Sequence, residues 1–370
     1  MDLKLFLKAL VETESPSHNK DAVDRVGSLV AKEAVRLGAQ IELIPNPETG
    51  THVLARFPAR KEMGDQGEAE KPILLLCHMD TVFPLGTLSR MPYREAEGKI
   101  FGPGVLDMKS GIVIGLAAIE DALMRGMRRP VTLLCTSDEE IGSQTSRTWI
   151  ESLASESALV LVLEPAMPDG SLKTWRKGVG DFTVKVKGRA AHAGGAHEMG
   201  RNAIEEMAHQ VIAIQKLTDY GRQTTLNVGV IRGGTVSNVV PEEAEIEVDF
   251  RVMQPGEWER LEEEMRNLKP VLDGTSIEVS GSLNRPPMPF DDTMKATFEK
   301  AKSIAVRIGI DLKASGTGGG SDANFVAPLG IPVLDGLGAV GEGPHSEREF
   351  IYADSLFGQS QLVSHLLTDW

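Results

Sequence analysis

Hydrophobic residues in the first half of the chain form short, unbroken runs with amphipathic segments between them. Three runs, at 73–77, 131–137 and 159–163, are apolar on both faces and have the length of a buried strand. Segments 18–37 and 110–125 repeat apolar residues at helical spacing, and a glycine follows each, as at many helix ends. This alternation predicts an α/β layer with a mixed, largely parallel sheet flanked by helices.

The pattern changes near residue 178, where apolar and polar residues begin to alternate with a period of two, interrupted by two amphipathic helical segments. The predicted order is βαββαβ, from 180–188, 200–216, 224–234, 244–252, 256–269 and 276–282. We therefore predict an inserted α+β domain at 178–283. The segments on either side, 1–177 and 284–370, then form one α/β domain, which a helix at 291–308 rejoins.

Charge and apolar content limit the partners of this protein. The formal net charge is -14, which repels phosphate backbones and anionic membrane surfaces. The amino-terminal segment lacks the basic start and unbroken apolar stretch of a secretory signal, and no segment has membrane-spanning length. We expect a cytoplasmic protein that binds neither nucleic acid nor membrane. Cys77 and Cys135 end apolar runs, which favours buried free thiols.

Acidic residues and histidines follow the three buried strands. His78-Met79-Asp80 comes after the first strand, Asp138-Glu139-Glu140 after the second, and Glu164 after the third. Ligands of open α/β sheets lie outside the carboxyl ends of the strands, so these side chains are expected to converge. Asp107, in a glycine-rich turn before a helix, and His345, after another glycine-rich segment, are further candidates.

Each of these residues has an ordinary explanation when it is taken alone, such as a helix cap, a solvated turn or the end of a strand. Together, the two imidazoles and three carboxylates supply three negative charges against the four positive charges of two divalent ions, and one bridging hydroxide completes the balance. We predict a two-metal hydrolytic site. Mixed nitrogen and oxygen ligands favour zinc, with cobalt or manganese as alternatives. The ligands would be His78, Asp107, Glu140, Glu164 and His345.

Two acidic residues remain for other tasks. Asp80 lies two positions after His78, on the same face of a strand, so it can accept the imidazole N–H and orient the ring. Glu139 and Glu140 are adjacent and project differently, so one can hold a metal ion while the other acts as general base. Their spacing alone leaves open which of the two is the base.

Seven motifs between about residues 70 and 350 resemble those of the M20 metallopeptidases, and most closely the glutamate carboxypeptidase (carboxypeptidase G2-like) branch. They are HMDTV, GPGVLDMKSG, TSDEEIGS, LEPA, GRAAHAG, VSNVVPEEAEIEVDFR and TGGGSDAN, in the order of the family. The resemblance implies a zinc-peptidase-like catalytic domain in which the five predicted residues are ligands and Asp107 bridges the two ions. It also implies that Asp80 orients His78, that Glu139 is the general base, and that the Asp107–Met108 peptide bond is cis.

The same resemblance implies that 178–283 is a lid and dimerisation domain, which pairs with a second subunit. His192 would reach a neighbouring active site and stabilise the tetrahedral oxyanion. Asn238, Arg285 and Gly320 would bind substrate, with the planar guanidinium of Arg285 holding a carboxylate. By themselves, these four residues would be interpreted as a loop histidine, a turn asparagine, a surface arginine and a flexible glycine.

The expected activity is therefore that of a di-zinc amidohydrolase or exopeptidase that removes a C-terminal amino acid of glutamate type from a small peptide. Two alternatives within the family are an N-acyl amino acid deacylase and a di- or tripeptidase. A noncatalytic metal- or peptide-binding protein is the alternative from another class. It is disfavoured because every predicted ligand and Glu139 are present.

Overall fold

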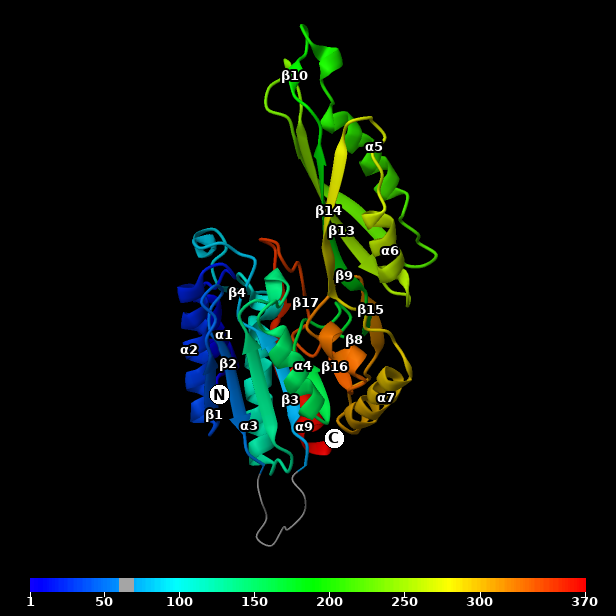
Figure 1. Ribbon diagram of the computed structural model, residues 1–370. Helices are drawn as coiled ribbons and strands as arrows, with labels where there is room; N and C mark the ends of the chain where they lie inside the picture. Colours follow the sequence, from blue (N-terminus) through cyan, green and yellow to red (C-terminus); the bar gives the residue numbers. More distant parts are fainter. Residues whose placement is uncertain (60–69) are drawn as a thin grey trace. The chain divides into compact units, whose positions relative to one another are not determined.

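The computed structural model describes residues 1–59 and 70–370, and these residues form two compact units (Figure 1). The first unit contains Met1–Trp175, Pro289–Thr317 and Ser321–Trp370, and the second contains Arg176–Met288 and Gly318–Gly320. Arg285 and Gly320, two of the predicted substrate-binding residues, thus belong to the second unit.

The first unit is built on an eight-stranded mixed sheet with the order β1-β2-β6-β3-β7-β16-β8-β15. Its four central strands, β6, β3, β7 and β16, are parallel, and β1, β2 and β8 are antiparallel to their neighbours. The strands are β1 (Gln40–Ile44), β2 (His52–Phe57), β3 (Ile73–His78), β6 (Val131–Thr136), β7 (Leu159–Val162), β8 (Leu172–Arg176), β15 (Ala314–Thr317) and β16 (Val333–Asp335). The prediction of a mixed, largely parallel sheet is confirmed.

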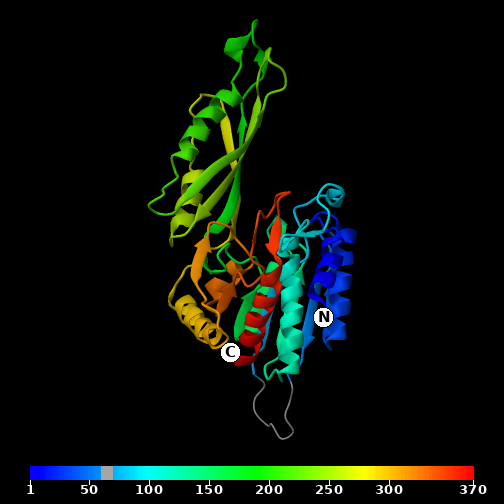
Figure 2. The same cartoon turned by 180° about the vertical axis from the view of Figure 1, so that it is seen from behind.

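The three predicted apolar strands are β3, β6 and β7, and every residue in them is buried. Helices cover both faces of the sheet, which explains why these strands have no polar side. Figure 2 shows α2, α3 and α9 side by side over one face, and α4 lies over the other face in Figure 1. The helices of this unit are α1 (Leu3–Val11), α2 (Lys20–Arg36), α3 (Ser110–Met124), α4 (Arg147–Glu156), α7 (Asp292–Arg307), α8 (Ala323–Val326) and α9 (Ala353–Asp369), with short 3-10 helices η1 (Thr87–Ser89) and η5 (Ala327–Leu329).

Local sequence explains where the predicted helices begin and end. The Asn19 side chain accepts a hydrogen bond from the backbone N–H of Ala22 at the start of α2, and Asp291 accepts one from Met294 at the start of α7. After α2 the chain leaves the helix at Gly38, whose φ of +92° lies in the left-handed region that glycine tolerates best. Helix propensity and tertiary packing therefore agree in these segments.

A second, small sheet of the first unit has the order β17-β18-β5-β4. Its strands are β4 (Arg94–Ala96), β5 (Lys99–Phe101), β17 (Gly341–Glu342) and β18 (Phe350–Tyr352). Strand β18 is antiparallel to β5, with Phe350 opposite Phe101. The end of the segment that precedes β18 therefore lies beside the start of the segment that follows β5, although the two are far apart in the sequence.

The second unit is a four-stranded antiparallel sheet with the order β11-β13-β9-β14 and two helices. Its elements are β9 (Gly178–Lys187), β10 (Ala191–His192), η4 (His197–Met199), α5 (Ala203–Gln215), β11 (Thr225–Gly233), β12 (Val239–Val240), β13 (Glu243–Val252), α6 (Glu257–Arg266) and β14 (Ser276–Arg285). The main elements follow the predicted βαββαβ order. One face is apolar and forms a core of its own, in which Phe182 and Phe250 pack against Trp258 of α6.

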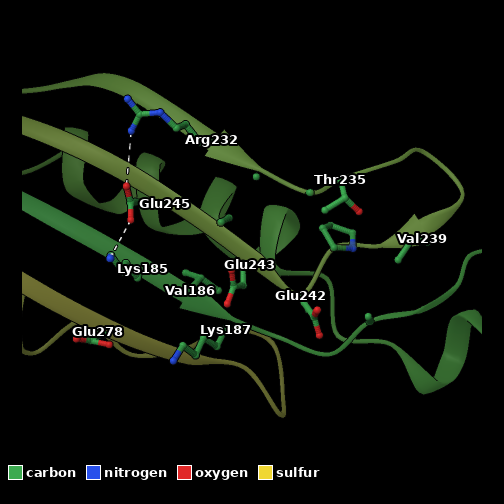
Figure 3. Close-up of a pocket in the computed structure, with 15 residues that line it drawn as sticks. Lys185, Val186, Lys187, Arg232, Thr235, Val239, Glu242, Glu243, Glu245 and Glu278 are labelled. Carbon is green, nitrogen blue, oxygen red and sulfur yellow. Dashed lines mark ion pairs between the residues drawn. The ribbon is translucent and has the colours of Figure 1, made fainter.

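A cavity of about 570 Å³ lies beside β9, β11 and β13 in this unit (Figure 3). Two positive side chains of its lining, Lys185 and Arg232, lie 3.2 and 3.6 Å from the carboxylate of Glu245. Positive and negative charges in the lining thus pair with each other. None of the predicted site residues lines this cavity.

The close approach of α3 to β7 gives a prediction about stability. A Cβ atom on Gly111 would lie 2.1 Å from the carbonyl oxygen of Leu163, whereas one on Gly358, in α9, would meet no atom within 4 Å. We expect Gly111→Ala to destabilise the protein by about 1–3 kcal/mol through overpacking. The matched change Gly358→Ala should stabilise it by about 0.5–1 kcal/mol. Urea unfolding measures both, and equal effects would contradict the packing argument.

Candidate active site

The carboxyl ends of the central strands bring the predicted residues together. His78 is the last residue of β3, Glu139 and Glu140 lie in the 3-10 helix η3 (Glu139–Ile141) shortly after β6, and Glu164 follows β7. Because β6 and β7 flank β3 in parallel register, these segments leave the sheet at the same edge.

Asp107 and His345 come from two loops that the small sheet holds together. Asp107 lies in the tight turn η2 (Val105–Lys109), and its peptide bond to Met108 is cis, as the family resemblance implied. His345 has a φ of +61° in the segment between β17 and β18. These two loops bring the last two predicted ligands to the end of β3.

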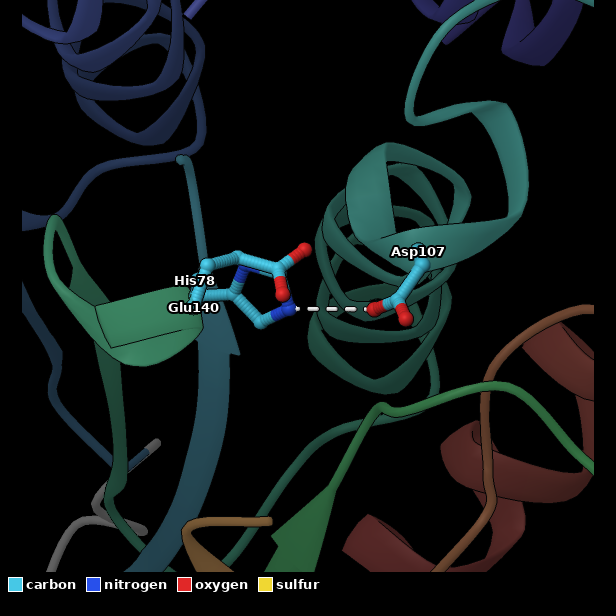
Figure 4. A group of neighbouring side chains, drawn as sticks. All are labelled: His78, Asp107 and Glu140. Carbon is cyan, nitrogen blue, oxygen red and sulfur yellow. Dashed lines mark hydrogen bonds and ion pairs between the residues drawn. The ribbon is translucent and has the colours of Figure 1, made fainter. Parts of the chain in front are cut away.

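Asp107 occupies the centre of the cluster, with each carboxylate oxygen near a different histidine. Its Oδ1 lies 3.1 Å from His78 Nε2, which Figure 4 marks with a dashed line, and its Oδ2 lies 3.3 Å from His345 Nε2. The two imidazoles thus approach the same carboxylate through different oxygens.

Each of the two histidines also contacts one further carboxylate. Glu164 Oε1 lies 3.5 Å from His78 Nε2, and Glu140 Oε2 lies 3.2 Å from His345 Nε2. The contacts therefore form two sets that share Asp107, one with His78 and Glu164 and the other with His345 and Glu140. Glu139 offers an oxygen within 4.8 Å of the ligand atoms of His78 and Glu164, so it adjoins the first set.

The electrostatics of the cluster favour positive charge between the carboxylates. Hydrogen bonds with Asp107 and Glu140 raise the pKa of His345 to about 11. Burial alone would lower the pKa of His78, but hydrogen bonds with the surrounding carboxylates, Asp107 first, raise it well above its ordinary value. So many carboxylates at the edge of an apolar core are costly without cations to compensate them.

The donor atoms fit divalent metal ions. Glu140 Oε1 is buried, with no hydrogen-bond partner among the residues that the structure describes. Groups of three potential ligands lie within 4.8 Å of one another, one of them His78, Asp107 and Glu140 (Figure 4). Imidazole nitrogens with carboxylate oxygens suit zinc, cobalt or manganese.

Asp80 supports the cluster in a way that its spacing from His78 did not predict. The hydrogen-bonding contact of His78 Nδ1, at 3.0 Å, is with the backbone carbonyl of Asp80, while the nearest carboxylate oxygen is 3.5 Å away. The carboxylate accepts hydrogen bonds from the backbone N–H groups of Glu139 and Glu140, at 3.3 and 3.2 Å, and from the hydroxyl of Ser17. Asp80 thus connects the end of β3 to η3.

The sequence pattern gave no signal for a buried polar network around Asp138, the residue that precedes η3. Asp138 Oδ2 accepts hydrogen bonds from the backbone N–H and the hydroxyl of Thr145, at 2.8 and 2.7 Å. The Thr145 hydroxyl also lies 3.1 Å from His52 Nε2, and His52 Nδ1 accepts the backbone N–H of Ser137. Burial lowers the pKa of His52, which favours its neutral form. Only the tertiary fold brings His52 and Thr145 beside Asp138.

The second unit holds the remaining predicted residues in two groups. His192 in β10 is opposite Val239 in β12, and the backbone carbonyl of Asn238 accepts the N–H of Ala193 at 3.0 Å. His192 Nδ1 accepts hydrogen bonds from Gly194 and Gly195, which leaves the proton of the neutral ring on Nε2.

Arg285 and Gly320 form the other group. Arg285 is buried opposite Val179 in β9, and it donates from Nη1 to Asn284 Oδ1 at 2.9 Å. The carbonyl of Gly320 accepts a hydrogen bond from Arg176, at the residue where the second unit begins. Val179 and Lys187 lie near opposite ends of β9, about 26 Å apart at the rise of a strand, and the chain reaches His192 only beyond Lys187. The two groups therefore lie toward opposite ends of the four-stranded sheet of this unit.

Comparison with known proteins identifies the family. Residues 74–369 match the family described as Peptidase family M20/M25/M40, so the chain belongs to it. It is 28% identical to carboxypeptidase G2 of Pseudomonas sp. (strain RS-16) over 377 residues, covering 98% of this chain and 88% of that protein. The protein is accordingly a metal-dependent peptide hydrolase.

Solved structures share its fold. The aminopeptidase PepT of Bacillus cereus ATCC 10987 superposes with a TM-score of 0.78 at 23% identity, covering 99% of this chain and 97% of that one. The YXEP protein of Bacillus subtilis, described as a dinuclear metal-binding peptidase of the M20 family, superposes with a TM-score of 0.67 at 18% identity and covers 99% and 97%.

Across 1–59 and 70–370, no helix combines the length and apolar character that crossing a bilayer requires. The cytoplasmic location stays a prediction.

The contacts of Asp80 predict that its charge holds η3 in place. We expect Asp80→Asn to lower the free energy of unfolding of the metal-free protein by about 1–3 kcal/mol, because an amide group cannot accept all three hydrogen bonds. Urea unfolding measures the change. Asp273→Asn, at an exposed position of the second unit, is the matched control. An equally small effect in both variants would show that η3 does not depend on the Asp80 carboxylate.

Proposed function

We propose that this protein is a di-zinc carboxypeptidase, which hydrolyses the amide bond to a C-terminal amino acid of glutamate type. The observation that carries the proposal is the position of Asp107 between two sets of ligands, each with one histidine and one further carboxylate. Cobalt or manganese could occupy the same ligands.

The proposed division of ligands gives each residue one task. Asp107 would bridge two ions, with His78 and Glu164 on one side and His345 and Glu140 on the other. When bound, the ions would polarise the substrate carbonyl and lower the pKa of a water molecule toward neutrality. Asp80 would hold His78 and η3 in the geometry that this requires.

Glu139 is proposed as the general base. One of its carboxylate oxygens lies within 4.8 Å of the ligand atoms of His78 and Glu164, and its backbone N–H donates to the Asp80 carboxylate. Its carboxylate would take a proton from the attacking water and pass it to the departing amine.

His192 is proposed to donate from Nε2 to the developing oxyanion. The N–H groups of Gly194 and Gly195 support this role, because they occupy Nδ1 and leave Nε2 as the donor of the neutral ring. A donor aimed at developing charge contributes about 3–4 kcal/mol to transition-state stabilisation. Asn238, Arg285 and Gly320 would bind the substrate, with Arg285 holding its terminal carboxylate.

Two related activities would use the same ligands. An N-acyl amino acid deacylase, like the proposed carboxypeptidase, would require a free carboxylate on the amino acid that it releases. A di- or tripeptidase is favoured by the structural likeness to an aminopeptidase. We prefer the carboxypeptidase because the match to carboxypeptidase G2 is higher in identity, and because the planar guanidinium of Arg285 suits a carboxylate.

We also propose a homodimer formed through the lid domain. His192 and Arg285 lie toward opposite ends of one lid sheet, so a rigid lid can hardly bring both to the same substrate. A second copy can supply the missing histidine. Exposed Ile204 and Ile212 on α5, with Ile231 on the edge strand β11, give this unit an apolar surface suited to such a contact.

The activity can be tested with zinc-loaded protein and three substrate classes, namely N-acyl amino acids, folates with terminal glutamate, and dipeptides. We expect release of the C-terminal amino acid to be fastest with glutamate. A chelator should abolish it and added zinc should restore it. Release of amino-terminal residues instead would favour the peptidase alternative, and hydrolysis that survives chelation would contradict the metal mechanism.

Glu139→Gln is the matched variant for this experiment. It should bind zinc like the unchanged protein and lose turnover by at least about a hundredfold, because the amide cannot accept a proton. Unchanged turnover would show that Glu139 is not the base.

The dimer predicts complementation between two inactive variants. Glu139→Gln and His192→Ala each impair their own homodimer, but a mixed dimer would contain one site with an intact Glu139 and a His192 from the other chain. We expect random mixing to recover about a quarter of the activity, because half of the dimers are mixed and each has one working site. Size-exclusion chromatography with light scattering checks the dimer. A mixture no more active than its components would exclude transfer of His192 between chains.

A further inference from the structure

Glu349 is completely buried four residues after His345, and none of the roles above includes it. Its carboxylate accepts hydrogen bonds from three backbone N–H groups, those of Gly104 at 3.2 Å, Leu106 at 2.7 Å and Asp107 at 3.0 Å. All three donors lie in the short segment that ends at Asp107, more than 240 positions earlier in the chain. One side chain thus connects the two loops that carry Asp107 and His345.

The segment that carries Glu349 is itself fixed at both ends. The backbone N–H of Ser346 donates to the carbonyl of Gly343, and that of Glu349 donates to the carbonyl of Ser346, each at 3.1 Å. Phe350 then begins β18, which pairs with β5. A shift of Glu349 relative to Asp107 would therefore strain the chain around His345.

The three N–H groups that donate to Glu349 belong to a turn whose backbone is not helical at Asp107. The turn itself therefore provides few other acceptors for them. Buried N–H groups without acceptors are costly. Loss of the Glu349 carboxylate as acceptor should let the turn move at Asp107. The two carboxylate oxygens of Asp107 must face His78 and His345.

We propose that Glu349 is a positioning residue that holds the Asp107 turn against the His345 segment and thereby sets the affinity of the site for divalent ions. The inference rests on the proposed metal centre, but its test does not require peptidase activity.

The test compares Glu349→Gln with the unchanged protein in binding Co²⁺ and Zn²⁺, by competition with a chromophoric chelator. We expect the affinity for at least one ion to fall about 10- to 100-fold, as when other groups that orient metal ligands are replaced. The visible absorption spectrum of the cobalt protein should change as well, because it reports ligand geometry. The matched control is Glu347→Gln, whose carboxylate is 60% exposed and pairs with Arg90 at the surface. It should leave affinity and spectrum unchanged.

Urea unfolding of the metal-free proteins separates positioning from stability. A variant that is less stable but keeps its cobalt affinity and spectrum would overturn the proposal. Glu349→Asp, which keeps the carboxyl group on a shorter side chain, should bind with intermediate affinity. If neither variant folds, Glu349 serves the stability of the whole unit and the proposal is also overturned. Unchanged protein that binds two ions but hydrolyses no substrate would refute the proposed function alone.

Discussion

The contact of one carboxylate with two imidazoles is the constraint on which the first unit depends. Asp107 can face His78 and His345 through different oxygens only if a turn, the end of a central strand and a distant loop meet within hydrogen-bonding distance. The parallel strands provide the common edge, and the small sheet provides the meeting of the two loops. The acidic surroundings then make positive charge favourable at that point.

Buried carboxylates that accept backbone N–H groups recur around this cluster. Asp80 binds the amides of η3, Asp138 binds the amides at residues 145 and 146, and Glu349 binds those of the Asp107 turn. Each holds a short segment that lies outside the α-helices and strands of the first unit. Such segments can place ligand side chains at angles that regular elements cannot reach, and several backbone hydrogen bonds to one buried carboxyl group hold them in place.

The two units differ in how their sheets are covered and in the residues that they carry. The first is a sheet covered by helices on both faces, and at Gly111 helix α3 packs so closely on Leu163, the residue before Glu164, that a larger side chain has no room. The second has its own apolar core on one face of its sheet. Residues proposed to act on substrate lie toward both ends of this second sheet, which is why a second chain enters the proposed mechanism.

The sequence by itself determined the element order, the largely parallel sheet and the five residues that cluster, because buried strands and alternating strands leave clear hydrophobic patterns and because ligands collect at strand ends. It could not determine that His78 contacts the backbone carbonyl of Asp80 more closely than its carboxylate, since this depends on the angle at which β3 ends. The roles of His52 and Glu349 were also decided by tertiary structure alone. Their partners lie 85 or more positions away, and no local pattern records contacts between such distant segments.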